Sequence, residues 1–462
     1  MAGASREPER VARVLLAFGV LFVVAGHMMF GYPAGPNLAY DLFPTAAFGV
    51  MMLVFGTGYL LEGEEDAGLL RHLWDCVRRF LIPMLAAHAL AGVLCAILAP
   101  LGFPAYGKAG LSPYNVFVSP FTHANMHEFG FDLGLWIVVP LLAAEVSYSL
   151  LRKVFVHGGD RVRAIIDVVL AAALTAGGIW VMDAFGSPEV GKAISETDWL
   201  RLAQAGTFLA FLPLGHVYRR HLEPLADHIP DAPAIAVLVG IQIALMLNFP
   251  DKMGMNPCWM QFPAGGGLSA LMAACGTLLW LRISRVLAAG QRRGSLLSVV
   301  GRNAYAILAF HVLGFFLVNL LFSALAPAVG GPLFDGFSDE SFRSVVRYGF
   351  VPAPLADAER AEAWGLVYLI AGVGVPVALG ELWRLASRIV RRAWARRHDE
   401  KGRTTGESGD TPGPVDKSRG GSGGTTTPIA PKERYPYGRI AGGSPSSVSR
   451  RPNPRRGHQR GL

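Results

Sequence analysis

The chain has 462 residues, of which 52% are hydrophobic and only 16% are charged. This composition and the positive mean hydropathy exclude an ordinary water-soluble domain and predict an integral membrane protein. The formal net charge of +8 does not favour nucleic-acid binding, because the Arg residues lie at the ends of apolar runs and in the C-terminal tail rather than on one periodic face.

Apolar stretches long enough to cross a bilayer recur along the chain. A helix needs about 20 mostly apolar residues to cross a hydrocarbon layer about 30 Å thick. Helices are expected, because lipid offers the backbone no hydrogen-bond partner and the alternation of a barrel is missing. The fold class is therefore all-α, a polytopic membrane helix bundle of about ten transmembrane helices. The predicted spans are 11–30, 43–61, 79–99, 132–151, 164–184, 200–217, 233–249, 264–281, 301–329 and 363–390.

Basic residues lie at every second connection between these spans. By the positive-inside rule these connections face the cytoplasm. Both termini are then cytoplasmic, and a multi-pass protein of the cell membrane is predicted. The connection at 330–362 fits least well, because it is assigned to the outside but carries arginines. The basic segments are Arg6 to Arg13, Arg71 to Arg79, Arg152 to Arg163, Arg219 and Arg220, Arg282 to Arg293, and Arg391 to Arg397.

The composition changes near residue 398 to Gly, Ser, Thr, Pro and Arg, as in "GGSGGTTTP". Such a segment cannot bury a core. Residues 398–462 are therefore predicted to form a disordered, basic cytoplasmic tail, and residues 1–397 the transmembrane domain.

Ionisable side chains fall inside several predicted spans. Each costs a few kcal/mol to insert, so it normally faces a partner or a cavity and is a site candidate by default. The simpler interpretation is a neutral imidazole that bonds a neighbouring carbonyl and helps helices pack. We favour such a packing role for His88 and for Glu145. Glu145 and Glu381 also lie near the ends of their spans, where a long side chain can reach the membrane surface at little cost. The full set is His27, His88, Glu145, His311 and Glu381.

Depth along the helix separates the histidines. His27 follows Arg13 by a distance of about 21 Å at 1.5 Å per residue, which places it in the outer third of the first span. His311 lies about 13 Å beyond Arg302, near the middle of its span.

No metal site is predicted from the sequence. His123, His127 and Glu128 lie close together in an external loop, but the HExxH order of a zinc protease is missing. The four cysteines show neither paired nor zinc-like spacing. They are Cys76, Cys95, Cys258 and Cys275.

Four stretches of the sequence stand out: "VLFVVAGH" in the first span, "MMLVFGTGYLLEG" in the second, "GFDLGLWIVVPLL" at the start of the fourth and "VGRNAYAILAFHVL" in the ninth. Taken together they resemble acyltransferase family three, whose members are membrane enzymes that move acyl groups onto glycans and related hydroxyl compounds. The first resembles the end of the family's first span and places its catalytic histidine at His27, and the last is similar to a late-span pattern that closes on a histidine, here His311. The other two resemble the second-span signature around Tyr59 and the opening of span four at Trp136.

"LWDCVRRFLIPML" resembles the family's basic run at the start of span three, with Arg79 four residues before Pro83. Two departures are visible. Leu16 stands where a basic residue is common, and Cys76 stands where the first of two spaced arginines is expected.

The resemblance implies an acyl-coenzyme A-dependent O-acyltransferase with catalytic His27 and His311. The donor is a co-substrate, so no tightly bound cofactor is expected. Imidazole suits a general base because its ordinary pKa is near neutrality. Arg78 and Arg79 would hold the donor's phosphates, although membrane topology alone also explains these two residues. The acceptor would be a carbohydrate or lipid-linked hydroxyl compound, and its candidate contacts are Tyr32, Asp41, Tyr59 and Trp136.

Two other functions fit the same pattern. A secondary transporter also has many spans with ionisable groups near the midplane, but no inverted repeat is visible. A noncatalytic partner in envelope assembly is the third possibility, and the histidine motifs favour it least.

Overall fold

The structure is a computed structural model of the full chain. It describes residues 7–29, 48–61, 68–103, 110–122, 129–187, 189–190, 197, 199–250, 255–290, 295–329, 337, 339–344 and 358–406. These residues form helices and no strand, so the predicted all-α class is confirmed. The chain divides into two units, Met1–Gly421 and Ser422–Leu462, and every described residue lies in the first.

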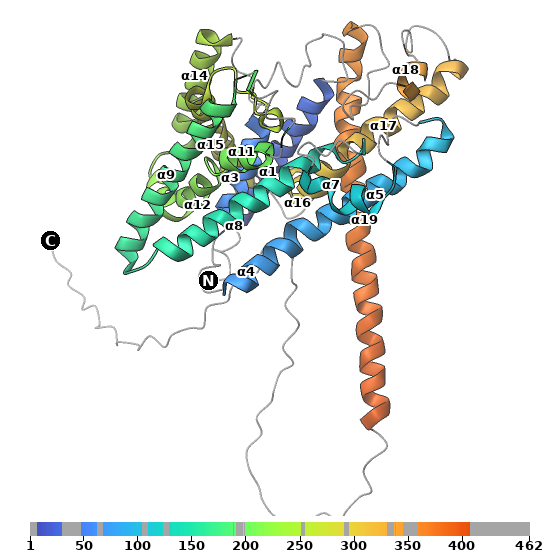
Figure 1. Cartoon of the computed structure of the whole chain (residues 1–462), viewed down its shortest axis with the longest axis horizontal. Coiled ribbons are helices and arrows are strands. Elements are labelled where there is room, and N and C mark those ends of the chain that lie inside the picture. Colours follow the sequence, from blue (N-terminus) through green and yellow to red (C-terminus); the bar gives the residue numbers. More distant parts are fainter. Residues whose placement is uncertain are drawn as a thin grey trace, which may run out of the picture. The chain divides into compact units, whose positions relative to one another are not determined.

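The helices follow the predicted spans (Figure 1). Within the described residues, eight helical stretches are long and apolar enough to cross a membrane. They include α1 (Glu7–Met29), α4 (Leu69–Cys76) with η3 (Val77–Leu81) and α5 (Ile82–Leu98), η6 (Leu133–Ile137) with α8 (Val138–Phe155), α9 (Asp160–Phe185), α14 (Asp231–Asn248), α15 (Gly266–Gly290), α17 (Ala304–Val329) and α19 (Ala358–Gly406).

Two predicted spans form shorter helices. Span 43–61 contains α3 (Gly49–Tyr59), and its residues 43–47 lie outside the described part. Span 200–217 is divided into α11 (Trp199–Phe208) and α12 (Leu212–Val217). Pro213 stands in the first turn of α12, where its missing N–H costs nothing and its fixed φ favours a new helix start.

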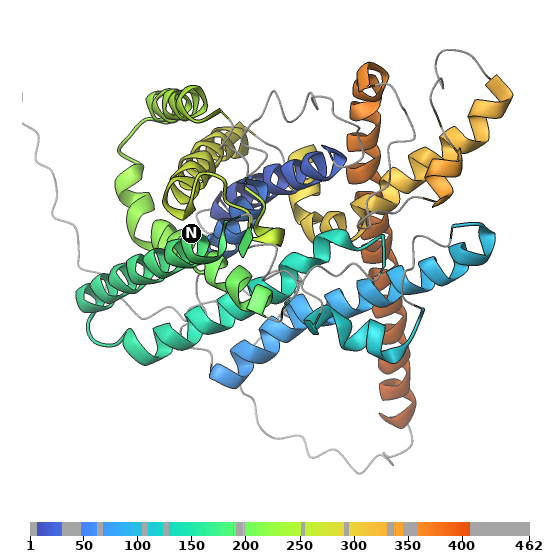
Figure 2. The same cartoon turned by 45° about the horizontal axis from the view of Figure 1, so that its top comes forward.

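Helix α1 packs against α3, α15, α16 (Leu296–Arg302), α17 and α19, and Figure 2 shows it among them. Small residues permit this packing. A Cβ at Gly49 would lie 2.8 Å from the carbonyl oxygen of Gly19, and one at Gly301 only 1.8 Å from that of Arg13. Backbone-to-backbone approach of this kind requires glycine. By contrast, only 6% of the apolar window of α14 is buried, as expected for a helix that faces lipid.

Two helices contain a π-helical turn with the same sequence pattern. η3 carries "RRFLIP" and η7 (Tyr218–Leu222) carries "RRHLEP". In each, a proline follows shortly after the turn and has no N–H for the normal hydrogen-bond ladder. The ladder shifts accordingly, since the N–H groups of Ile82 and Glu223 donate to the fifth residue back.

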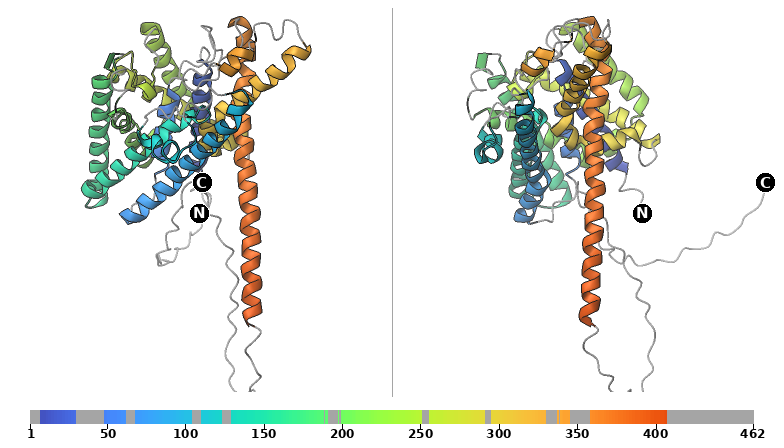
Figure 3. Two further views of the ribbon diagram at one scale, coloured as in Figure 1. Left: turned by 45° about the vertical axis from the view of Figure 1, so that its right-hand side comes forward. Right: turned by 90° about the vertical axis from the view of Figure 1, so that its right-hand side faces the viewer.

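Helix α19 continues to Gly406, well past the ends of its neighbours (Figure 3). Residues 398–406, which the composition assigned to the tail, are therefore helical. Residues 407–462 lie outside the described part of the chain.

Candidate functional site

The structure brings the two predicted catalytic residues together. His27 lies in the last turn of α1, and His311 lies in α17. Their imidazole rings are stacked, with centroids 4.7 Å apart and planes 15° apart. This contact joins the first and the penultimate predicted span, so no local pattern in either segment could have shown it.

The hydrogen bonds of His311 assign its tautomer. Its Nδ1 lies 3.0 Å from the carbonyl oxygen of Ile307 and 3.2 Å from that of Leu308, and carbonyls only accept, so Nδ1 carries the proton. Its Nε2 is buried and bonds no described residue. A proton there would be a buried donor without an acceptor, which is costly. The ring is therefore neutral, with a lone pair on Nε2.

Neighbouring groups hold the His311 ring in place. Phe315 meets it edge-on at a centroid distance of 5.8 Å. Gly134 in η6 packs against it, because a Cβ at this glycine would lie 3.2 Å from Cε1 of His311 and 2.3 Å from the carbonyl oxygen of Leu308. Gly134 therefore belongs to the site. The only sequence signal for it was a glycine inside the predicted fourth span.

His27 differs from His311 in exposure. His311 is 0% exposed, whereas His27 is only partly buried. It also lies at the C-terminal end of α1, where the unpaired carbonyls favour a nearby positive charge by about 0.3–1 kcal/mol. Tyr32 and Asp41, the predicted acceptor contacts, follow α1 but lie outside the described residues, as do His123, His127 and Glu128.

The two predicted phosphate-binding arginines have different surroundings. Arg79 forms an ion pair with Glu145 on α8, and its guanidinium also lies 4.5 Å above the ring of Phe80. Arg78 is exposed and has no ion-pair partner among the described residues. We predicted a packing role for Glu145 from the sequence, since nothing in its local sequence links it to Arg79 on the preceding span.

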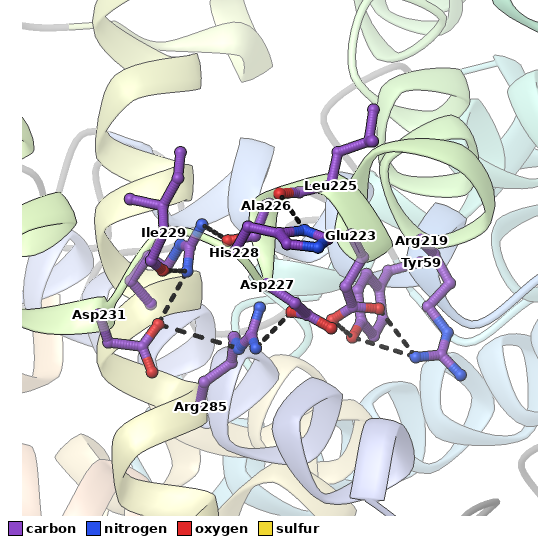
Figure 4. Close-up of polar contacts among 11 residues, drawn as sticks. Tyr59, Arg219, Glu223, Leu225, Ala226, Asp227, His228, Ile229, Asp231 and Arg285 are labelled. Carbon is purple, nitrogen blue, oxygen red and sulfur yellow. Dashed lines mark hydrogen bonds and ion pairs between the residues drawn. The ribbon is translucent and has the colours of Figure 1, made fainter.

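Tyr59 lies far from the histidine pair. It belongs to the same buried cluster as Val11 and Leu15, near the opposite end of α1, and Leu15 lies about 18 Å along the helix from His27. Its hydroxyl donates to Glu223 at 2.6 Å and accepts from Arg219 at 3.4 Å. Figure 4 shows this group beside the pairs that Arg285 makes with Asp227 and Asp231.

Trp136 is buried on η6, two residues after Gly134. Its ring packs against Phe208 at 6.1 Å, and its carbonyl accepts a hydrogen bond of 2.8 Å from Arg201. The contacts thus place the indole against α11, while the same short helix reaches His311 through Gly134.

His88 joins a second buried network. Its Nδ1 contacts Asp132, and its Nε2 lies 2.8 Å from the carbonyl oxygen of Asn115. The expected carbonyl partner is therefore present, together with a carboxylate that was not expected. Asp132 precedes η6, so this network anchors the element that supports His311. Glu381 pairs with Arg302 at 2.8 Å, near the start of α17.

Comparison with known proteins identifies the family. The model of an acyltransferase domain, that of acyltransferase family 3, matches residues 12–350, well over half of the chain. No curated protein and no solved structure shows a significant match. The matched region contains the histidine pair, η3 with its arginines, and η6. The chain is therefore a membrane acyltransferase that belongs to acyltransferase family 3.

Proposed function

We propose that the protein transfers an acyl group, most simply acetyl, from acyl-coenzyme A to a hydroxyl of an envelope glycan, a lipid-linked sugar or a similar acceptor. The stacked pair of His27 and His311 carries this proposal. Two imidazoles held in one orientation inside a membrane acyltransferase supply a base for the proton that an attacking hydroxyl must lose.

The proposed reaction needs one proton acceptor. The acceptor oxygen attacks the thioester carbonyl carbon while His27 takes the hydroxyl proton. The carbon–sulfur bond then breaks, and the imidazolium returns the proton to the departing thiolate of coenzyme A. The carbonyl end of α1 stabilises the transient positive charge on His27.

Exposure distinguishes the two histidines in this scheme. His27 is partly buried and is the ring that a substrate hydroxyl can reach. His311 is fully buried and acts through His27 as a positioning residue. The ring of His311 is neutral and nearly parallel to that of His27. It therefore holds the His27 ring in place without a positive charge that would oppose protonation of His27.

Acyl-coenzyme A would enter from the arginine-rich side of η3. Arg78 is exposed there and suited to phosphate. Tyr305 donates a hydrogen bond of 3.3 Å to the carbonyl of Phe80, which ties η3 to α17 about 9 Å along the helix before His311. An extended pantetheine arm can cover this separation.

The proposal also fixes an orientation. The arginine-rich ends of the helices would face the cytoplasm, where acyl-coenzyme A is made, with both termini on that side of the cell membrane. The end of α1 that carries His27 would then face outward, where an envelope acceptor is found. Tyr32 and Asp41 follow His27 in the sequence and are the proposed acceptor contacts, together with Trp136.

This function is tested by incubating membranes that contain the protein with labelled acetyl-coenzyme A and envelope glycan. We expect transfer of the label, and a loss of about 10²–10⁴-fold in His27→Ala, because proton transfer by a positioned base contributes that much. His157→Ala is a matched control, since His157 is exposed. Full transfer by His27→Ala would contradict the assignment of the base. Uptake of a solute without transfer or thioester hydrolysis would instead favour a transporter.

A further inference from the structure

Three metal-ligating side chains converge beside η3, outside the histidine pair. His72 and Cys76 lie one turn apart on α4, and Glu145 faces them from α8. Figure 1 shows these two helices side by side. One ligand atom from each residue lies within 4.8 Å of the other two. The three residues are 3%, 1% and 0% exposed.

The carboxylate of Glu145 is not fully satisfied by the protein. Its Oε1 accepts a hydrogen bond of 3.3 Å from the thiol of Cys76 and pairs with Arg79. Its Oε2 is buried and bonds no described residue. A buried carboxylate oxygen without a partner is costly, and a cation at this position would remove that cost.

We propose that His72, Cys76 and Glu145 bind Zn²⁺. Imidazole, thiolate and carboxylate are the donors that zinc uses in proteins. Ligand atoms about 2.0–2.3 Å from a tetrahedral ion lie roughly 3.5 Å from one another. The Sγ of Cys76 lies 3.5 Å from Nε2 of His72 and 3.3 Å from Oε1 of Glu145, so the site needs little rearrangement.

The charges are also compatible with the ion. Zn²⁺, the thiolate of Cys76 and the carboxylate of Glu145 sum to zero around a neutral His72. Arg79, whose side chain is 17% exposed, contacts the same oxygen Oε1, so it would shift to Oε2 or turn toward solvent when the ion binds. Three protein ligands leave a fourth position, which a water or an anion would fill.

The sequence did not indicate this site, because its third ligand comes from another helix. The spacing of His72 and Cys76, one helical turn apart, was the available signal. Bound zinc would join α4 to α8 at the side of the bundle where η3 presents its arginines.

The site is tested by a titration. The full-length protein in detergent is stripped of metal with a chelator and then titrated with Co²⁺. We expect one equivalent of Co²⁺ with a near-ultraviolet sulfur-to-cobalt absorption band, which added Zn²⁺ removes. Cys76→Ser should lose the band. Cys95→Ser should keep it, because Cys95 is equally buried on α5 but is outside the cluster.

The wild-type titration decides the proposal even if a variant fails to fold. A wild-type protein that shows no cobalt–thiolate band overturns it, as does a band that survives in Cys76→Ser. His72→Gln and Glu145→Gln should each weaken zinc binding in elemental analysis after dialysis. Unchanged zinc content in both variants would also overturn the assignment.

Discussion

The two ends of α1 have different polar chemistry. At the end near Arg13, carboxylates pair with guanidiniums, as Glu9 does with Arg13 at 3.1 Å and as Glu223 does with Arg219 at 2.9 Å beside Tyr59. At the other end, His27 is stacked on an imidazole whose Nε2 is left open. A carboxylate in an ion pair takes up a proton only in acid, whereas a neutral imidazole can take one up near neutral pH. The end of α1 near Arg13 therefore holds helices together, whereas the end with His27 has the groups that can take part in a reaction.

The expected free energies and rate effects support the same distinction between the two ends of α1. Partly exposed ion pairs contribute about 0–1 kcal/mol each, so the charged end mainly fixes how helix ends meet. A base that gains a proton at the right moment changes a rate by several powers of ten. The following substitutions test this division, beginning with the largest expected effect.

Gly134→Val should damage the histidine end most. Its Cβ would lie 2.3 Å from a backbone oxygen of α17, which no side-chain rotation can relieve. We expect a loss of about 3 kcal/mol in the free energy of unfolding, at the upper end for overpacking. Thermal unfolding in detergent measures it. Gly240→Val is the control, because no atom lies within 4 Å of a Cβ there. Equal melting of the two variants would show that η6 does not pack as described.

His311→Phe should reduce activity with little effect on folding. Phenylalanine keeps an aromatic ring beside His27 but loses both nitrogens. We expect a roughly 10- to 100-fold lower kcat, less than for loss of the base itself, with an unchanged KM for acyl-coenzyme A. The pH profile of kcat should also change, which a purely structural residue would not cause. A wild-type profile and rate would remove His311 from the proposed reaction.

Tyr59→Phe should weaken the charged end by a moderate amount. It removes the hydrogen bond of 2.6 Å to Glu223, a loss of about 1 kcal/mol in unfolding free energy. Tyr148→Phe is the matched control, because the hydroxyl of Tyr148 is buried and bonds no described residue. A higher KM for the acyl donor with unchanged stability would instead assign Tyr59 to substrate binding.

The smallest effect is expected in α18 (Asp339–Ser344), which belongs to neither of the two regions compared above. Hydrogen bonds from Arg343 and then Ser323 hold the pKa of Asp339 below its ordinary value. Because the pKa of Asp339 is lowered in the folded state, its ionised carboxylate stabilises the contact fully at pH values above the ordinary pKa of about 3.9. This stabilisation is lost as the pH falls through the lowered pKa. Hydrogen exchange in α18 should therefore increase only in acid. Asp339→Asn should raise exchange at neutral pH as well, and unchanged exchange would contradict the contact.

Much of the fold followed from hydropathy, because each span needs only its own sequence to be recognised. The helices α1, α9 and α17 begin and end within a few residues of their predicted spans. The interruption between α11 and α12 was missed, although Pro213 was a visible signal for it.

The site was less accessible to sequence reasoning. His27 and His311 were identified by their surroundings, but stacking is a relation between two helices and leaves no trace in either one. The partners of Arg79 and His88 were missed for the same reason, since Glu145 and Asp132 lie on other elements. Composition alone cannot pair residues that are so far apart along the chain.

The π-helical turn η3 has a consequence for the register of its helix. A π turn holds one residue more than an α turn, and each residue of an α-helix turns the face by about 100°. Deleting Leu81 would thus rotate α5 against α4 and turn His88 away from Asp132, while His72 and Cys76 kept their positions. A single-residue deletion here would change which side of α5 faces the bundle, and the same holds for the helix that follows η7.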